Sequence, residues 1–313
     1  EATNEAYRAS GLFHMLSISG LHMVIMEGAV FFSVRLLLAA LPAIALRYPI
    51  KKWAAVSGIV AAIAYLAISG GAFATVRAAV QIVIMFLAIL FDRPALALRN
   101  VALAAFLILL VFPESLFDPG FQMSFAAVAA LVASYEEVRR RFSNPSEPHP
   151  VLRVFLFFGG IVLSTLIASA AVAPFAAYHF HQSQQFALIA NLLAIPICNF
   201  IVMPAALCAL VLMPLGLESL PLLVMGKGIE AMTWCAGFVA ALPGAVVQIP
   251  AIPGLAFLLL VSGGLWLIVW RSRWRYGGIA LAITGLALAP ALPRPDLLVA
   301  RNGELVAVRG TDG

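Results

Sequence analysis

Long apolar runs alternate with short polar stretches along almost the whole chain. We count ten apolar runs, at residues 14–40, 53–70, 73–91, 96–112, 120–135, 154–178, 186–213, 221–242, 254–270 and 276–292. A helix that crosses a bilayer needs about 20 mainly apolar residues, because its backbone N–H and C=O groups must be satisfied within the segment. The pattern therefore predicts an all-α protein, a polytopic transmembrane helical bundle of about ten spans.

The charges of the connecting loops support this count. Loops on the cytoplasmic side of a membrane carry an excess of Lys and Arg. Every second loop is basic, and these loops are 47–52, 92–99, 136–153 and 271–275. Loop 214–220 holds only Glu218 and is an exception. With ten spans, the alternation predicts that both ends of the chain lie outside the cytoplasm, and that 136–150 is a solvated cytoplasmic connector.

Two segments near the C-terminal end depart from the pattern. Segment 243–253 is apolar but interrupted by proline and glycine, which favours a short interfacial or re-entrant loop. Beyond Pro293, two short alternating runs flank Asn302-Gly303, which is typical of a β-hairpin with a type I′ turn. We expect a transmembrane domain at 1–293 and, at 294–313, the start of an extracytoplasmic β-containing domain.

The composition excludes an ordinary soluble domain. Apolar residues make up 63% of the 313 residues and charged residues 11%, against about half and a quarter in soluble domains. The net charge of +5 says little about partners, because membrane proteins collect basic residues in cytoplasmic loops. The three cysteines lie in apolar runs without the paired spacing of metal or disulfide sites. We therefore predict no metal and no cofactor.

Polar side chains within the first span are candidates for function. Such groups are costly in hydrocarbon, so they usually face a bundle interior or a water-filled cavity. Ser19 and His22 are three residues apart and share a helix face, and Glu27 follows. Hydrogen bonding of the histidines to a neighbouring helix is the alternative. A protease pair of Ser19 and His22 is disfavoured, because no oxyanion loop or third group can be identified.

Three further spans carry polar groups. Arg77 and Gln81 are four residues apart and project to one side, although Arg77 is also near enough to the span end to reach lipid headgroups. Asp118 and Pro119 are typical of a helix start, and Gln122 follows them.

In the seventh span, Asn191 and Asn199 flank Pro196, whose ring frees a backbone carbonyl. A proline kink with asparagines joining helices is the alternative. Lys227 and Glu230 are expected to neutralise each other, and His179 and His181 are expected to be surface histidines of an outer loop.

Together these residues are expected to line a polar passage. The candidate site comprises His14, Ser17, Ser19, His22, Glu27, Arg77, Gln81, Gln122, Ser124, Asn191 and Asn199. We expect the conduit to be formed by the first, third, fifth and seventh spans, with Arg77 near the outer mouth.

Several motifs resemble one known family. They are GLFHMLSISGLHM (11–23), Val76-Arg77-Ala78, DPGFQMSF (118–125), YHF (178–180) and ANLLAIP (190–196). In these stretches the chain resembles the central membrane region of the ComEC competence proteins. The resemblance implies a channel in the bacterial cytoplasmic (inner) membrane that passes single-stranded DNA inward during natural transformation.

The resemblance also implies neighbours and partners. An OB-like domain would precede this region and a metallo-β-lactamase-like domain would follow it, both outside the cytoplasm. Any nuclease would belong to the latter domain, so we predict that this chain is not an enzyme. A DNA receptor on the outer side and a helicase-like ATPase on the inner side are expected partners.

A motor is expected because DNA entry requires work. Bringing each phosphate charge into an inside-negative cell costs about 2.3 kcal/mol per 100 mV, and the sequence has no Walker A pattern. The alternative function is a small-solute secondary transporter with Pro196 and the asparagines at a midplane site, but the two halves show no convincing repeat. A scaffold for outer domains is disfavoured by polar groups in several spans.

Overall fold

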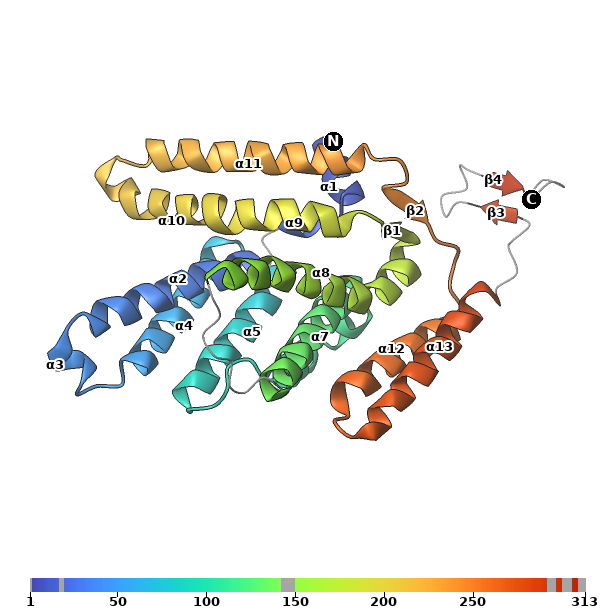
Figure 1. Ribbon diagram of the computed structural model, residues 1–313, viewed down its shortest axis with the longest axis horizontal. Helices are drawn as coiled ribbons and strands as arrows, with labels where there is room; N and C mark the ends of the chain where they lie inside the picture. Colours follow the sequence, from blue (N-terminus) through green and yellow to red (C-terminus); the bar gives the residue numbers. More distant parts are fainter. Residues whose placement is uncertain (1, 17–19, 142–149, 292–296, 300–305, 309–313) are drawn as a thin grey trace. The chain divides into compact units, whose positions relative to one another are not determined.

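The computed structural model describes residues 2–16, 20–141, 150–291, 297–299 and 306–308, and most of them are helical (Figure 1). The chain divides after Gln248 into two compact units, Glu1–Gln248 and Ile249–Gly313.

Each of the ten apolar runs contains a helix. The helices of the runs are α2 (Gly20–Ala39), α4 (Ile50–Ile68), α5 (Phe73–Leu90), α6 (Leu98–Val111), α7 (Pro119–Arg141), α8 (Pro150–Phe180), α9 (Ala187–Ile197) with α10 (Met203–Leu212), α11 (Ser219–Ala240), α12 (Gly254–Val269) and α13 (Gly277–Leu288). Six helical segments among the described residues are long and apolar enough to cross a membrane, and α6 and α12 are shorter apolar helices. The prediction of a helical membrane bundle is thus confirmed.

Short elements connect these helices. They are α1 (Ala2–Ala9), α3 (Pro42–Ala45), the 3-10 turns Phe13–Met15, Pro113–Phe117, Met213–Leu215, Arg273–Tyr276 and Ala289–Ala291, and the strands β1 (Gln182–Gln184), β2 (Val246–Gln248), β3 (Leu297–Val299) and β4 (Val306–Val308).

Large apolar side chains cover the outside of the helices. Phe32, Leu36 and Leu37 of α2 are 64%, 73% and 68% exposed. A water-soluble protein rarely presents contiguous apolar surface of this kind. This surface is therefore suited to contact with the acyl chains of lipids.

Three apolar clusters hold the first unit together. One joins α2, α4 and α5, a second joins α5, α6 and α7, and a third joins α1, α9 and α11. Small residues allow the close approach of α4 and α5, since a Cβ on Gly58 would lie 2.6 Å from the Phe86 ring. Close packing through small residues is the usual way in which helices associate in lipid, where the hydrophobic effect gives no drive.

Two strands join distant loops of the first unit. The predicted interfacial or re-entrant loop 243–253 contains β2, which pairs with β1 in antiparallel register, with Gln182 opposite Gln248. In Figure 1 this ribbon lies at the ends of α8 and α11. The pairing gives the backbone of both loops hydrogen-bond partners.

The proline of the seventh span locally widens its helix. Pro196 has no N–H to donate, and the chain forms a π-helical turn at Cys198–Val202 between α9 and α10. Helix α11 packs on this turn, where a Cβ on Gly228 would lie 2.7 Å from a Val202 methyl group. The segment Ala187–Leu215 thus remains long enough to span a bilayer.

The basic end of α7 leads into the predicted connector, of which residues 142–149 lie outside the described part. Glu137 accepts hydrogen bonds from Arg140 and Arg141, and these bonds lower the pKa of the Glu137 carboxyl. Lys227 and Glu230 on α11 pair as predicted, with 2.7 Å between Nζ and Oε2.

The second unit contains a tight helical hairpin of α12 and α13. Glycines permit it, since a Cβ on Gly278 would lie 2.5 Å from the carbonyl oxygen of Gly263. The predicted β-hairpin is present as antiparallel β3 and β4, with Leu297 opposite Val308. Its proposed turn, Asn302-Gly303, lies outside the described residues.

Candidate functional site

Arg77 lies in the first turns of α5 and is largely buried. Its side chain is 11% exposed, and its Nη1 atom is 3.5 Å from the Oδ1 atom of Asp118. The guanidinium carbon also lies 5.0 Å from the centroid of the Phe73 ring. These contacts orient a cation inward, and they disfavour the alternative in which Arg77 only reaches for lipid headgroups.

Asp118 begins α7 as the sequence predicts. Its Oδ1 atom accepts a hydrogen bond of 2.7 Å from the backbone N–H of Phe121, and Pro119 is the first helical residue. This is the capping arrangement that satisfies an unpaired N–H group at a helix start. The same carboxylate oxygen faces Arg77, so one side chain both starts α7 and contacts α5.

Gly120 makes room for this contact. A Cβ at Gly120 would lie 3.0 Å from Asp118 Oδ1 and 3.3 Å from Arg77 Nη2. The guanidinium therefore approaches the N-terminus of α7, where the helix dipole favours negative charge. Asp118 supplies that charge and makes the approach of a cation tolerable.

Gln122 extends the contacts to a third helix. Its Nε2 atom donates to the carbonyl of Leu116 at 2.8 Å, and its Oε1 atom accepts from His179 Nε2 of α8 at 2.8 Å. With the amide in this orientation, the His179 nitrogen carries the proton. The contacts from Arg77 to His179 thus link α5, α7 and α8, and we call Arg77, Asp118, Gly120, Gln122 and His179 the polar network.

We expect Gln122 and His179 to be energetically coupled. Gln122→Leu and His179→Leu should each destabilise the chain, because each leaves a polar partner unpaired, and the double variant should lose less than their sum. The coupling free energy should be about 1–2 kcal/mol. Thermal unfolding of the purified chain in detergent measures it.

A matched control uses a neighbouring polar residue of α7. Ser124 is half-buried, and the cycle of Ser124→Ala with His179→Leu should show coupling near zero. Equal coupling in both cycles would mean that the hydrogen bond between Gln122 and His179 contributes nothing specific.

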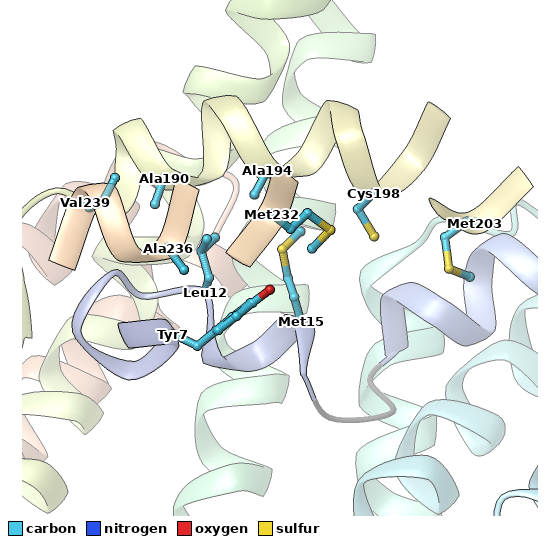
Figure 2. Packing of buried hydrophobic residues seen from close by; sticks show 10 residues of the cluster. All are labelled: Tyr7, Leu12, Met15, Ala190, Ala194, Cys198, Met203, Met232, Ala236 and Val239. Atoms are coloured by element: carbon cyan, nitrogen blue, oxygen red, sulfur yellow. The ribbon is translucent and has the colours of Figure 1, made fainter. Parts of the chain in front are cut away.

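A second contact group joins the first and last motifs. Leu12 and Met15 pack against Ala190 and Ala194 of α9 in the buried cluster of Figure 2. Gly11 has φ +78°, and a Cβ there would lie 2.8 Å from the Cβ atom of Ala187. Glycine is required by both the backbone conformation and the close approach.

Tyr7 of α1 completes this cluster from below α9 in the same view. Its ring is buried (Figure 2), and its hydroxyl lies 3.1 Å from the hydroxyl of Thr233 on α11. Residues that are far apart in sequence thus hold α1, α9 and α11 together.

The other predicted site residues are dispersed. Ser17 and Ser19 lie outside the described residues. His14 is exposed and its Nδ1 atom donates to the carbonyl of Gly11 at 3.0 Å, while His22 lies within electrostatic range of His14.

Buried polar atoms without hydrogen-bond partners occur on several spans. Among the described residues they include both carboxylate oxygens of Glu27, Nε2 of Gln81, and Oδ1 of Asn191 and of Asn199. Glu27 is 1% exposed and lies on the face of α2 that carries Met23 and Phe31, in the apolar cluster with α4 and α5. The passage lined by all the predicted residues therefore stays a prediction, and Arg77 and Gln122 are the two of them that belong to the polar network.

Two residues of the polar network were missed from sequence. Asp118 was interpreted only as a helix start, and His179 as a surface histidine of an outer loop. The structure instead places His179 within α8, hydrogen-bonded to Gln122. The available signal was that both residues belong to motifs of the family resemblance, DPGFQMSF and YHF.

These features define a multi-pass helical membrane protein in which a polar network connects three helices. The chain belongs to the Competence protein family, which matches residues 1–274. ComE operon protein 3 of Bacillus subtilis (strain 168) is 26% identical over 205 residues, which are 64% of this chain and 23% of that protein. The chain thus matches less than a quarter of that relative's length. No solved structure matches the chain.

Proposed function

We propose that this chain forms the membrane conduit through which single-stranded DNA enters the cytoplasm of a competent bacterium. Membership of the Competence protein family supports a role in DNA uptake. The observation that carries the conduit is the polar network, in which motif residues from separate parts of the sequence meet across three helices. We assign the chain no catalytic step.

Arg77 has the chemistry for contacting the DNA backbone. A guanidinium binds phosphate oxygens through paired N–H donors, and the start of α7 beside it adds the positive end of a helix dipole. The contact to Asp118 is long, at 3.5 Å, so a phosphate can compete with that carboxylate. Passing phosphates would then exchange with Asp118 at this point.

Transport needs a separate source of energy in this proposal. Each phosphate entering against an inside-negative potential costs about 2.3 kcal/mol per 100 mV. A cytoplasmic helicase-like ATPase would supply this work, and an outer DNA receptor would deliver the strand. The proposed site is the bacterial inner membrane, with both ends of the chain on the outer side.

The direct test follows labelled DNA into cells. Cells that carry the full-length protein should accumulate labelled single strands in the cytoplasm, whereas cells lacking it should hold DNA only at the surface, because no other path crosses the bilayer. Equal cytoplasmic label in both strains would reject the conduit. If the purified protein moved DNA inward against a membrane potential without an ATPase, the proposed ATPase would be rejected and the conduit would stand.

A small-solute secondary transporter remains the second candidate. The observation that favours it is the π-helical turn after Pro196, on the segment that carries Asn191 and Asn199. The amide oxygens of these asparagines have no hydrogen-bond partner in the part of the chain that the structure describes. Interrupted helices with free polar groups form the substrate sites of such transporters. Solute uptake that depends on these asparagines, with normal DNA entry, would favour this function.

A further inference from the structure

We propose that the tip of the α12–α13 hairpin is a binding site for the headgroups of anionic phospholipids. The tip, defined here as Trp266–Tyr276, contains three arginines and four aromatic residues. They are Arg271, Arg273, Arg275, Trp266, Trp270, Trp274 and Tyr276. This inference does not depend on the proposed conduit.

The aromatic side chains of the tip are held in place and reach outward. The indole N–H of Trp266 donates to the carbonyl of Trp274 at 2.8 Å, and the rings of Trp266 and Trp270 lie 5.4 Å apart. Trp274 is 76% exposed and Tyr276 is 60% exposed. Trp and Tyr with one apolar and one polar side are typical of the boundary between lipid tails and headgroups.

The arginines alternate with these rings. Arg271 and Arg273 are exposed and Arg275 is half-buried. The sequence from Gly254 to Pro290 contains no Asp or Glu, so the hairpin carries a net positive charge at one end. Phosphate oxygens are the groups that guanidinium donors match best. The charge of the tip therefore complements an anionic headgroup.

The hairpin that carries the tip is rigid and short. The glycines at 263, 278 and 285 bring the two backbones so close that a Cβ at any of them would lie 2.5–2.8 Å from a backbone atom of the partner helix. At about 1.5 Å per residue, α12 with its 16 residues is about 24 Å long, less than the hydrocarbon thickness of about 30 Å. Snorkelling arginines and interfacial rings compensate for such a mismatch.

Lipid fits the tip better than single-stranded DNA does. DNA binding uses aromatic rings along a water-filled basic groove. Here the rings continue the apolar surface of the hairpin, on which Val269, Ile283 and Leu286 are more than half exposed. A surface that passes directly from exposed aliphatic side chains to rings and arginines follows the polarity profile of a bilayer.

The test measures which lipids the purified full chain retains. The protein is placed in nanodiscs of equal parts phosphatidylcholine and phosphatidylglycerol, and the lipids that remain bound are identified by native mass spectrometry. Wild type should be enriched in phosphatidylglycerol. The triple variant Arg271→Gln, Arg273→Gln, Arg275→Gln should lose affinity by roughly fivefold per arginine, on the order of 100-fold in all.

Two controls distinguish a specific headgroup-binding site from non-specific attraction by positive charge. The triple change to lysine keeps the charge but removes the paired guanidinium donors, so it should reduce the enrichment, though less than the change to glutamine. Changing Arg139, Arg140 and Arg141 to glutamine removes the same charge elsewhere, and should have a smaller effect because Glu136 and Glu137 precede these arginines whereas the tip contains no Asp or Glu. Circular dichroism confirms that the variants keep their helices.

Three outcomes would overturn the proposal. The first is equal phosphatidylglycerol enrichment in wild type and in the glutamine variant of the tip. The second is unchanged lipid enrichment together with loss of binding to a fluorescent oligothymidylate, which would assign the tip to DNA. The third is an equal loss in the Arg139–Arg141 variant, which would show that charge alone acts.

Discussion

Replacing Arg77 with glutamate should lower DNA uptake at least about tenfold while the protein remains at its normal level in the membrane. The side chain of residue 77 faces the Asp118 carboxylate at 3.5 Å. The glutamate side chain is shorter than that of arginine, and two carboxylates about 5 Å apart repel each other by about 3 kcal/mol at an effective dielectric constant of about 20. Each 1.4 kcal/mol, roughly, corresponds to a factor of ten in an equilibrium constant. Transformants per recipient cell, normalised to protein level, measure the effect.

Arg35 of α2 provides the matched control. It is exposed on the outside of its helix, so Arg35→Glu makes the same charge change away from the network and should affect uptake far less. Normal uptake in Arg77→Glu cells would remove Arg77 from the mechanism.

The helices could be predicted from sequence because each depends on a property of its own residues. A run such as 221–242 is apolar along its length and therefore forms a helix in lipid whatever its neighbours are, and α11 covers Ser219–Ala240. Local signals also gave the start of α7, since Asp118 caps it, and the pair of strands near the C-terminal end.

The contacts between helices could not be predicted in the same way. His179 and Gln122 are 57 residues apart, and nothing in the local sequence states that α7 and α8 bring them to 2.8 Å. The pairing of β1 with β2 is of the same kind, since Gln182 and Gln248 belong to loops that were interpreted separately. Hydropathy indicates what it costs to bury a polar group in the membrane. It does not indicate which residue of another helix will pair with that group.

The family motifs partly replaced this missing information. Val76-Arg77-Ala78, DPGFQMSF and YHF were recognised as separate stretches, and their polar residues meet in the structure. In contrast, polarity alone selected Gln81 and Asn199, whose buried amide atoms have no hydrogen-bond partner among the described residues. Motif membership was not sufficient either, since Asn191 belongs to ANLLAIP and its Oδ1 atom also has no hydrogen-bond partner among the described residues.

Glu27→Leu should stabilise the chain and impair DNA uptake. The Glu27 side chain is 1% exposed in an apolar cluster, and neither carboxylate oxygen has a hydrogen-bond partner in the described part of the chain. Burial of such a group costs about 1–3 kcal/mol in protein mutational data. A leucine of similar size removes that cost, and thermal unfolding of the purified chain in detergent measures the gain.

The predicted loss of DNA uptake follows from the free-energy cost of burying Glu27. A carboxylate within a span destabilises the fold, so a functional role is the default explanation for its presence. Thr75 of α5 is the control, because its buried hydroxyl also has no hydrogen-bond partner within the described segments, and Thr75→Val should raise stability without reducing uptake. Normal uptake by the leucine variant would exclude Glu27 from the DNA path. Lower stability of the leucine variant would show that the Glu27 carboxyl gains a hydrogen-bond partner in the bilayer. A more stable variant that has lost DNA uptake would identify Glu27 as a residue that serves transport although it lowers the stability of the fold.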